Sequence, residues 1–229
     1  MTDSADVPGG DVNVSPTGWA LLGMLSGGDE LSGYDVKKWI TWALRFFYPS
    51  PAYSQIYSEL KRLERGGLVS SRVEMDGARS RRMYKITPRG LTLLTRWANE
   101  EPVEPPTIKH NPILRVMLGH LIAPGRLREI LVEHAEYADR MHRAAETESR
   151  WAVGQPAWSY ARLALLWSQR YYAAERDLAR QLIADLDTVE RQLNADGRQN
   201  FEFPGREYWY EVERRIAAEE PNALEGADD

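Results

Sequence analysis

Five polar or basic side chains gather in one stretch of the chain, and their types suit contact with nucleic-acid bases and phosphates. They are Ser50, Tyr53, Ser54, Gln55 and, further along, Lys61. A glutamine amide can form the paired hydrogen bonds that adenine presents in the major groove. Hydroxyl and phenol groups commonly bond phosphate oxygens. We therefore expect Ser54 and Gln55 to read bases and Tyr53 to hold the backbone, with Ser50 and Lys61 adding contacts.

Three arginines surround a predicted chain reversal, where folding itself requires no charge. Asp76-Gly77 is a strong turn signal, and Arg79, Arg81 and Arg82 follow it. Arginines on a thin β-ribbon can reach phosphates or the minor groove. For Arg82 an alternative stays open, in which the side chain remains on the sheet and pairs with Glu74.

The elements that must position these groups follow from the spacing of apolar residues. Helical spacing predicts three helices, strict alternation then predicts a hairpin, and a fourth helix ends the series. The helices open at Ser15-Pro16, near Ser32, near Pro51 and at Thr87-Pro88, and the hairpin follows Gly67. This is the order of a winged helix. In a helix-turn-helix pair the second helix, here the one from Pro51, enters the major groove.

The charge of the chain is unevenly distributed. The net charge is -5, but residues 33–98 hold thirteen Lys and Arg against five acids, whereas residues 1–32 hold five acids and no Lys or Arg. A basic block between acidic flanks is typical of an electrostatic binding surface confined to one module. An ordinary solvated face is the alternative.

Two long helical patterns follow a proline-rich segment, over roughly 113–147 and 157–193, and Pro124-Gly125 interrupts the first. The second carries an apolar seam that would leave large side chains in water unless it packs on something. We expect it to pair with a symmetry-related copy. Packing on the helix of residues 113–147 is a compatible alternative. The residues expected at the dimer interface are Tyr160, Trp167, Tyr171, Leu178 and Leu182.

The predicted fold is therefore mainly α with a small β-hairpin, a winged helix-turn-helix domain joined to a C-terminal helical dimerisation domain. We divide the chain into a flexible tail (1–14), a winged-helix DNA-binding domain (15–100) and a proline-rich linker (101–112). A helical dimerisation domain (113–197) and a C-terminal extension (198–229) complete it.

The aromatic residues allow two interpretations. Tyr57 shares a helix face with Leu60 and is expected in the core, while Tyr53 could serve either role. Several tryptophans could line a pocket for a flat aromatic or hydrophobic effector, although a core position is the more common use of such residues. These tryptophans are Trp39, Trp42, Trp97, Trp151, Trp158 and Trp167.

Patterns for catalysis, metals and membranes are missing from the sequence. The chain has no cysteine, no phosphate-binding glycine loop and no Gly-x-Ser-x-Gly motif. Its four histidines do not stand at metal-ligand spacings such as i, i+4. No stretch is long and apolar enough for a membrane span. We expect no enzymatic activity, metal or cofactor, and a cytoplasmic location.

Three segments resemble the PadR family of bacterial transcriptional regulators. They are Tyr53–Val69 (YSQIYSELKRLERGGLV), Arg81–Gly90 (RRMYKITPRG) and Ser32–Asp35 (SGYD). The resemblance covers roughly residues 16–100 well and residues 110–190 more loosely. It departs from the family at Ser54, where many relatives carry Gly, and after about residue 197.

The resemblance implies a homodimeric repressor that binds an inverted repeat in double-stranded DNA and is often released by a small effector. Together with the residues above, it predicts a sequence-specific, nucleoid-associated transcriptional regulator. The alternative is a winged-helix adaptor that binds proteins without DNA and has no need of Arg79 and Arg81.

Overall fold

The computed structural model describes residues 13–48, 50–76, 79–103, 105–123, 125–154, 156–195 and 205–219. Most of the predicted tail, the hairpin tip at Gly77 and Ala78, and much of the C-terminal extension lie outside these residues. The chain divides into two compact units, one drawn from Met1–Ile108 and Met141–Arg170, the other from Lys109–Arg140 and Tyr171–Asp229.

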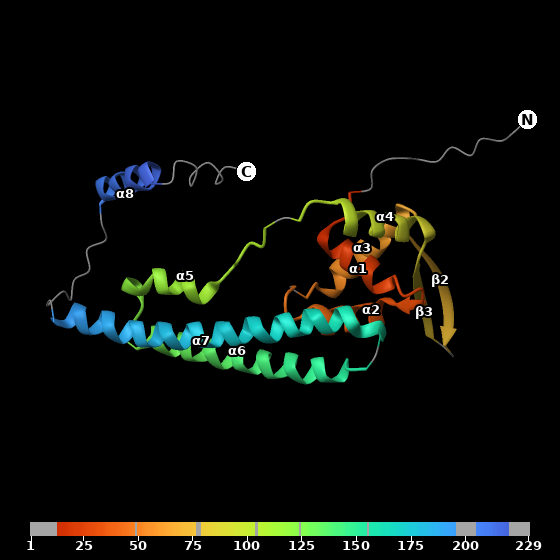
Figure 1. The fold of residues 1–229 in the computed structure, drawn as a ribbon. Coiled ribbons are helices and arrows are strands. Elements are labelled where there is room, and N and C mark those ends of the chain that lie inside the picture. The colour runs from red at the N-terminus through yellow and green to blue at the C-terminus, as the bar shows by residue number, and fades with distance from the viewer. Residues whose placement is uncertain are drawn as a thin grey trace, which may run out of the picture. The chain divides into compact units, whose positions relative to one another are not determined.

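The first unit contains a winged helix, built in the predicted order with one added strand (Figure 1). The predicted fold class, mainly α with a small β-hairpin, is confirmed. The elements are α1 (Pro16–Leu25), β1 (Leu31–Ser32), α2 (Gly33–Leu44), α3 (Tyr53–Arg65), β2 (Val69–Asp76), β3 (Arg79–Ile86) and α4 (Pro88–Glu100).

Short polar side chains fix where three of these helices begin. Ser15 caps α1 by accepting from the Gly18 amide, and Thr87 caps α4 in the same way through Gly90. At α2 the Ser32 hydroxyl accepts from the Asp35 amide, while the Asp35 carboxylate accepts from the Ser32 amide. Such caps satisfy amides that the first helical turn leaves without partners.

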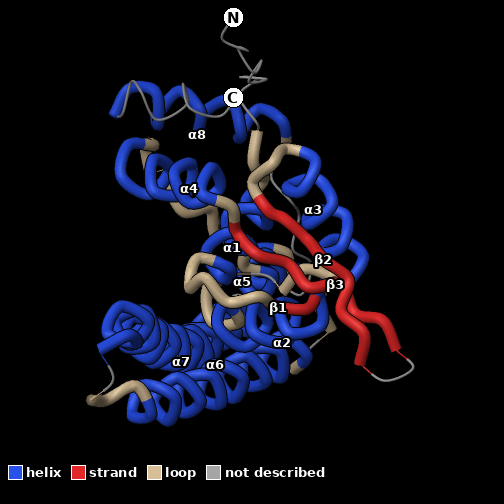
Figure 2. Tube along the Cα trace, turned by 90° about the vertical axis from the view of Figure 1, so that its right-hand side faces the viewer, coloured by secondary structure: helices blue, strands red, loops and turns tan. Residues whose placement is uncertain are grey.

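The sheet has three antiparallel strands in the order β1-β3-β2. The two-residue strand β1 was not predicted; it sets Leu31 opposite Tyr84, and both side chains are buried. Val69 and Ile86 face each other in the core, whereas Val73, on the same face of β2, is exposed. Burial is lost along the strand because β2 and β3 extend as a ribbon beyond the helices (Figure 2).

The core of the winged helix is one continuous apolar cluster. Leucines from α1 meet Val36 and Ile40 of α2, the buried face of α3, and Tyr84 of the sheet. Fully buried members include Leu21, Leu22, Val36, Ile40, Ile56, Leu60, Leu63 and Leu68. Packing of this kind fixes the orientation of α3 relative to α2 and the ribbon.

The remaining helices are α5 (Asn111–Met117), α6 (Arg126–Trp151), α7 (Ser159–Ala195) and α8 (Arg206–Glu219). The pattern over 113–147, expected to be interrupted at Pro124-Gly125, forms two helices. α5 ends earlier than that point, at Met117, and α6 begins at Arg126, directly after it. Within the second unit, Arg128 pairs with Asp187, and Asp139 pairs with Arg176. The pairs run in opposite directions along the two helices, so α6 and α7 are antiparallel. None of the helices described here is apolar enough over a sufficient length to cross a bilayer.

Gly90 is the position where the winged helix tolerates a side chain least. A Cβ there would come within 2.1 Å of the Leu68 carbonyl oxygen, a backbone atom that cannot swing away. We expect Gly90→Ala to lower the free energy of unfolding by at least about 1–3 kcal/mol, as overpacked cores do.

Gly23→Ala is the matched control, because a Cβ at that position in α1 meets nothing within 4 Å. It should leave stability unchanged or raise it by about 0.5–1 kcal/mol through helix propensity. Urea denaturation followed by circular dichroism compares the two, and equal stability of the two variants would contradict the packing described here.

Candidate nucleic-acid interface

The exposed side of α3 carries a stripe of hydroxyl and basic side chains. Ile56, Leu60 and Leu63 are buried, which turns the opposite side of the helix outward. There the residues spaced by four, three and four are Ser54, Ser58, Lys61 and Arg65, and all four are exposed. The expectation that Tyr57 is a core aromatic is wrong: it is 40% exposed, although its ring lies over Gly33.

The start of α3 is held by a basic residue that the sequence analysis missed. Lys37 of α2 donates to the Ser50 hydroxyl at 2.8 Å and to the Pro51 carbonyl at 2.7 Å. Its ammonium also lies 5.6 Å from the centre of the Tyr53 ring. Lys37 therefore adds positive charge beside Ser50 and Tyr53. Only the packing of α2 against α3 reveals this, since the residues are 13 and 16 positions apart.

Gln55 is divided between two roles. Its side-chain oxygen accepts from the Ala52 amide at 2.8 Å, which closes the first turn of α3. The side chain is exposed, so its NH2 group is the part that can meet an external acceptor. Tyr53 and Ser54 are exposed beside it.

Arg62 does not belong to the exposed basic stripe, because the fold uses its charge. It donates to the Glu59 carboxylate at 2.6 and 3.0 Å and to the Asn13 carbonyl at 2.6 Å. The hydrogen bond to Glu59 raises the pKa of Arg62. Glu59 also accepts from Ser15, so this pair connects α3 to the cap of α1.

The ribbon arginines differ in their surroundings. The register sets Arg81 opposite Glu74, and Arg82 opposite Val73. The alternative pairing of Arg82 with Glu74 is wrong, since Arg82 lies 3.4 Å from Glu64 of α3. Arg79 opens β3, but its side chain lies outside the described part of the chain.

Glu64 fastens the ribbon to α3. Its carboxylate accepts from the Ser71 hydroxyl of β2 at 2.5 Å and meets Arg82 of β3. The exposed side of α3 and the root of the ribbon are thereby held in one arrangement. Arg81 and Arg82 are both exposed beside it.

A second feature of the first unit is an aromatic cavity of about 470 Å³. Trp42 and Trp158 meet edge to face, with ring centres 5.9 Å apart. Glu148, which forms an ion pair with Arg45, supplies a carboxylate. The lining residues are Trp42, Thr147, Glu148, Trp151, Ala152, Trp158 and Leu165.

The tryptophans are not core residues, which corrects the more common interpretation of such side chains. All six considered in the sequence analysis are at least 40% exposed. Three of them, Trp42, Trp151 and Trp158, line the cavity, while Trp97 stacks on Trp19 at 4.9 Å.

Helix α7 has two apolar sides. One side is buried and consists of residues whose spacing matches the helical period: Leu165, Ser168, Tyr172 and Ala179. The residues predicted to dimerise fall on another side, where Tyr160 is 86%, Trp167 53% and Leu178 54% exposed. Tyr171 and Leu182, predicted with them, are half-buried. Packing within one chain thus leaves most of the predicted seam uncovered.

Two sequence comparisons with known proteins give PadR-like regulators. Residues 21–96 match the model of the transcriptional regulator PadR-like family. The negative transcriptional regulator PadR of Bacillus subtilis (strain 168) is 36% identical over 98 residues, which are 42% of this chain and 53% of that protein. The chain therefore aligns with about half the length of this curated relative.

Solved structures resemble a larger part of the chain, at 22% identity in each case. Bacillus subtilis PadR in complex with operator DNA has a TM-score of 0.65 and covers 74% of this chain and 98% of its own. The same protein with p-coumaric acid has a TM-score of 0.60, with 74% and 97% covered. The Vibrio cholerae virulence activator AphA reaches 0.59, with 75% and 98% covered. At this identity the likeness concerns the fold.

Proposed function

The chain belongs, through its residues 21–96, to the PadR-like family of transcriptional regulators, and on this premise we propose that it binds DNA. The proposal is a sequence-specific regulator that occupies an inverted repeat as a homodimer. Repression is the favoured direction, because the relative that aligns over 98 residues is a negative regulator. Such a protein acts in the cytoplasm, on the nucleoid.

One observation carries the proposal: the exposed stripe of α3 lies beside a ribbon of arginines in the basic block of the chain. Ser54 and the Gln55 amide group are the candidates for base contacts. The candidates for contacts to the DNA backbone are Ser50, Tyr53, Lys61 and the ribbon arginines Arg79, Arg81 and Arg82. The basic residues among them would replace counterions condensed on the phosphates.

The uncovered side of α7 supports the dimer. Large apolar patches on a soluble protein commonly mark an interface. Tyr160, Trp167 and Leu178 recur on one side of the helix, so a second copy of α7 could cover them with its own equivalents, as two-fold symmetry requires. Two heads presented by such a dimer would meet half-sites about 34 Å apart.

We propose the aromatic cavity as the effector site. A volume of about 470 Å³ lies within the range of small-molecule pockets, and Trp42, Trp151 and Trp158 suit a flat ring. Thr147 offers a hydrogen bond. The structure of Bacillus subtilis PadR with p-coumaric acid makes a planar phenolic acid the natural first probe.

The DNA contact is tested with a duplex selected from fragments of the source genome. Arg81→Glu should weaken binding by at least about tenfold. It should also reduce the slope of log affinity against log salt by about 1 for each phosphate that the variant no longer neutralises. Arg140→Glu makes the same charge change at an exposed position of α6 and should have little effect.

Gln55→Glu sharpens this test, because a carboxylate oxygen can still accept from Ala52 while the NH2 donor is removed. It should reduce discrimination between operator and random duplex with the fold of α3 intact. Fluorescence anisotropy at several salt concentrations gives both quantities. If Arg81→Glu and Gln55→Glu bind the operator like the wild type, the chain is an interaction module that does not use DNA.

The dimer is tested by placing a charge in the seam. Leu178→Asp should convert the dimer to a monomer, since each copy would lose burial worth about 1.5–3 kcal/mol and gain a desolvated carboxylate. Val103→Asp, at a position that is 95% exposed, is the control. Size-exclusion chromatography with light scattering measures the mass, and a monomeric wild type would refute the dimer.

The effector site is tested by adding p-coumaric acid to the DNA complex. We expect affinity for the operator to fall about 5–150-fold, the usual range of allosteric coupling. Trp158→Ala should abolish the response, whereas Trp39→Ala, outside the cavity, should retain it. A response of equal size in both variants would place the effector elsewhere.

A further inference from the structure

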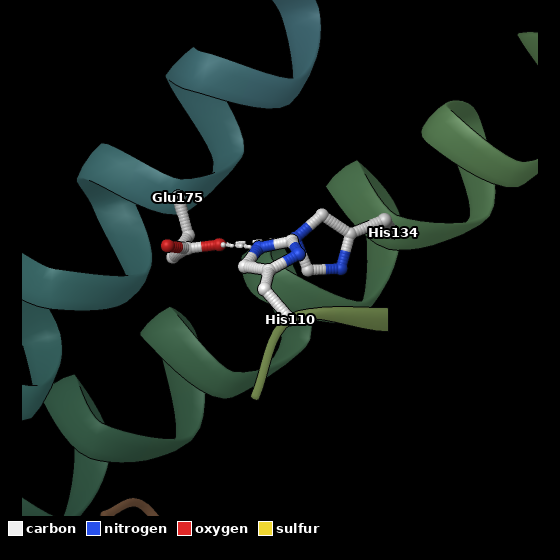
Figure 3. Close-up of side chains that lie close together, drawn as sticks. All are labelled: His110, His134 and Glu175. Carbon is white, nitrogen blue, oxygen red and sulfur yellow. Dashed lines mark hydrogen bonds and ion pairs between the residues drawn. The ribbon is translucent and has the colours of Figure 1, made fainter. Parts of the chain in front are cut away.

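Three side chains of the second unit converge on one point (Figure 3). His110 precedes α5, His134 lies on α6 and Glu175 lies on α7. The Nε2 atoms of His110 and His134 stand 2.9 and 3.0 Å from the same oxygen of Glu175. The three side chains are only 18%, 17% and 15% exposed.

We propose that His110, His134 and Glu175 bind a divalent transition-metal ion such as Zn²⁺. One ligand atom from each side chain lies within 4.8 Å of the others. Two imidazole nitrogens and a carboxylate oxygen are a common ligand set for Zn²⁺ with an open fourth position. The spacing of the histidines along the chain gave no such indication, because packing of three separate elements assembles the site.

The two nitrogen–oxygen distances require only a small adjustment. Around a tetrahedral ion with bonds of about 2.0 Å, neighbouring ligand atoms are about 3.3 Å apart. The two nitrogen–oxygen distances, 2.9 and 3.0 Å, are a few tenths shorter. The two imidazole nitrogens lie within 4.8 Å of each other, and binding of the ion requires side-chain rotations that bring them closer.

The other nitrogen of His110 gives the proposal a structural consequence. Nδ1 of His110 accepts from the Ile113 amide at 3.2 Å and caps α5, so Nε2 carries the proton that Glu175 accepts. A metal ion can bind Nε2 only if the proton leaves that atom. A neutral imidazole ring with the ion on Nε2 then carries its one proton on Nδ1. Nδ1 can no longer accept, so metal binding removes the cap of α5.

Two tyrosines contact the cluster. The Tyr171 hydroxyl hydrogen-bonds Glu175, and the Tyr137 ring stacks on His134 with centres 6.4 Å apart. A hydrogen bond to a ligating carboxylate, such as the one from Tyr171, orients that ligand. The ion would thereby join the segment before α5 to α6 and α7, independently of the contacts proposed for DNA.

The test uses the full chain, freed of metal by a chelator. Titration with Co²⁺, followed by its visible absorption spectrum, and competition for Zn²⁺ with a chromophoric chelator should each give one ion per chain. Glu175→Gln and His134→Gln should weaken binding by more than the ~10–100-fold that loss of an outer-layer partner costs. His142→Gln is the matched control, since this half-buried histidine of α6 bonds the Gln169 carbonyl, away from the cluster.

Circular dichroism and light scattering establish that each variant is folded and of the same mass as the wild type. If the ligand variants do not fold, the test uses the wild-type protein alone. Zn²⁺ should then speed hydrogen exchange at the Ile113 amide, because His110 Nδ1 no longer accepts its hydrogen bond. A wild type that binds neither ion, or binding that survives both ligand substitutions, would overturn the proposal. Operator binding is measured separately, so failure of the metal site leaves the DNA test unaffected.

Discussion

Burial of one face of α3 is the constraint on which the rest of the winged helix depends. Ile56, Leu60 and Leu63 are fully buried against α1, α2 and the sheet, so the helix has a single rotational setting. A rotation that exposed these three side chains would cost about 1.5–3 kcal/mol for each. The outward direction of Ser54 and Lys61 is therefore a consequence of the core.

Ion pairs divide the basic residues into two groups. Arg62 and Arg72 use their charge within the fold, on Glu59 and on Glu30 and Glu74. The hydrogen bond from Arg72 lowers the pKa of Glu30. Lys61, by contrast, is an exposed cation on the stripe of α3. The net charge of the basic block thus overstates the cations that could meet a partner, and their placement matters more than their number.

The C-terminal helices show how one helix can serve several contacts. Helix α7 buries one side within its own chain, leaves Tyr160 and Leu178 exposed on another, and supplies Glu175 to the histidine cluster. Burial acts to raise the pKa of Glu175, but the hydrogen bonds from His110 and His134 outweigh it and lower the pKa. The carboxylate is therefore an anion, available to two imidazoles or to a cation.

The sequence by itself determined the order of the elements, the starts of α1, α2 and α4, and the basic block, because these depend on local spacing and on residues close in the chain. Strand β1 escaped prediction, since two residues carry no period. Four features required the tertiary structure: the role of Lys37, the pairing of Arg82 with Glu64, the tryptophan cavity and the His110–His134–Glu175 cluster. Each joins residues from separate elements, and only packing of the apolar faces decides which distant side chains meet.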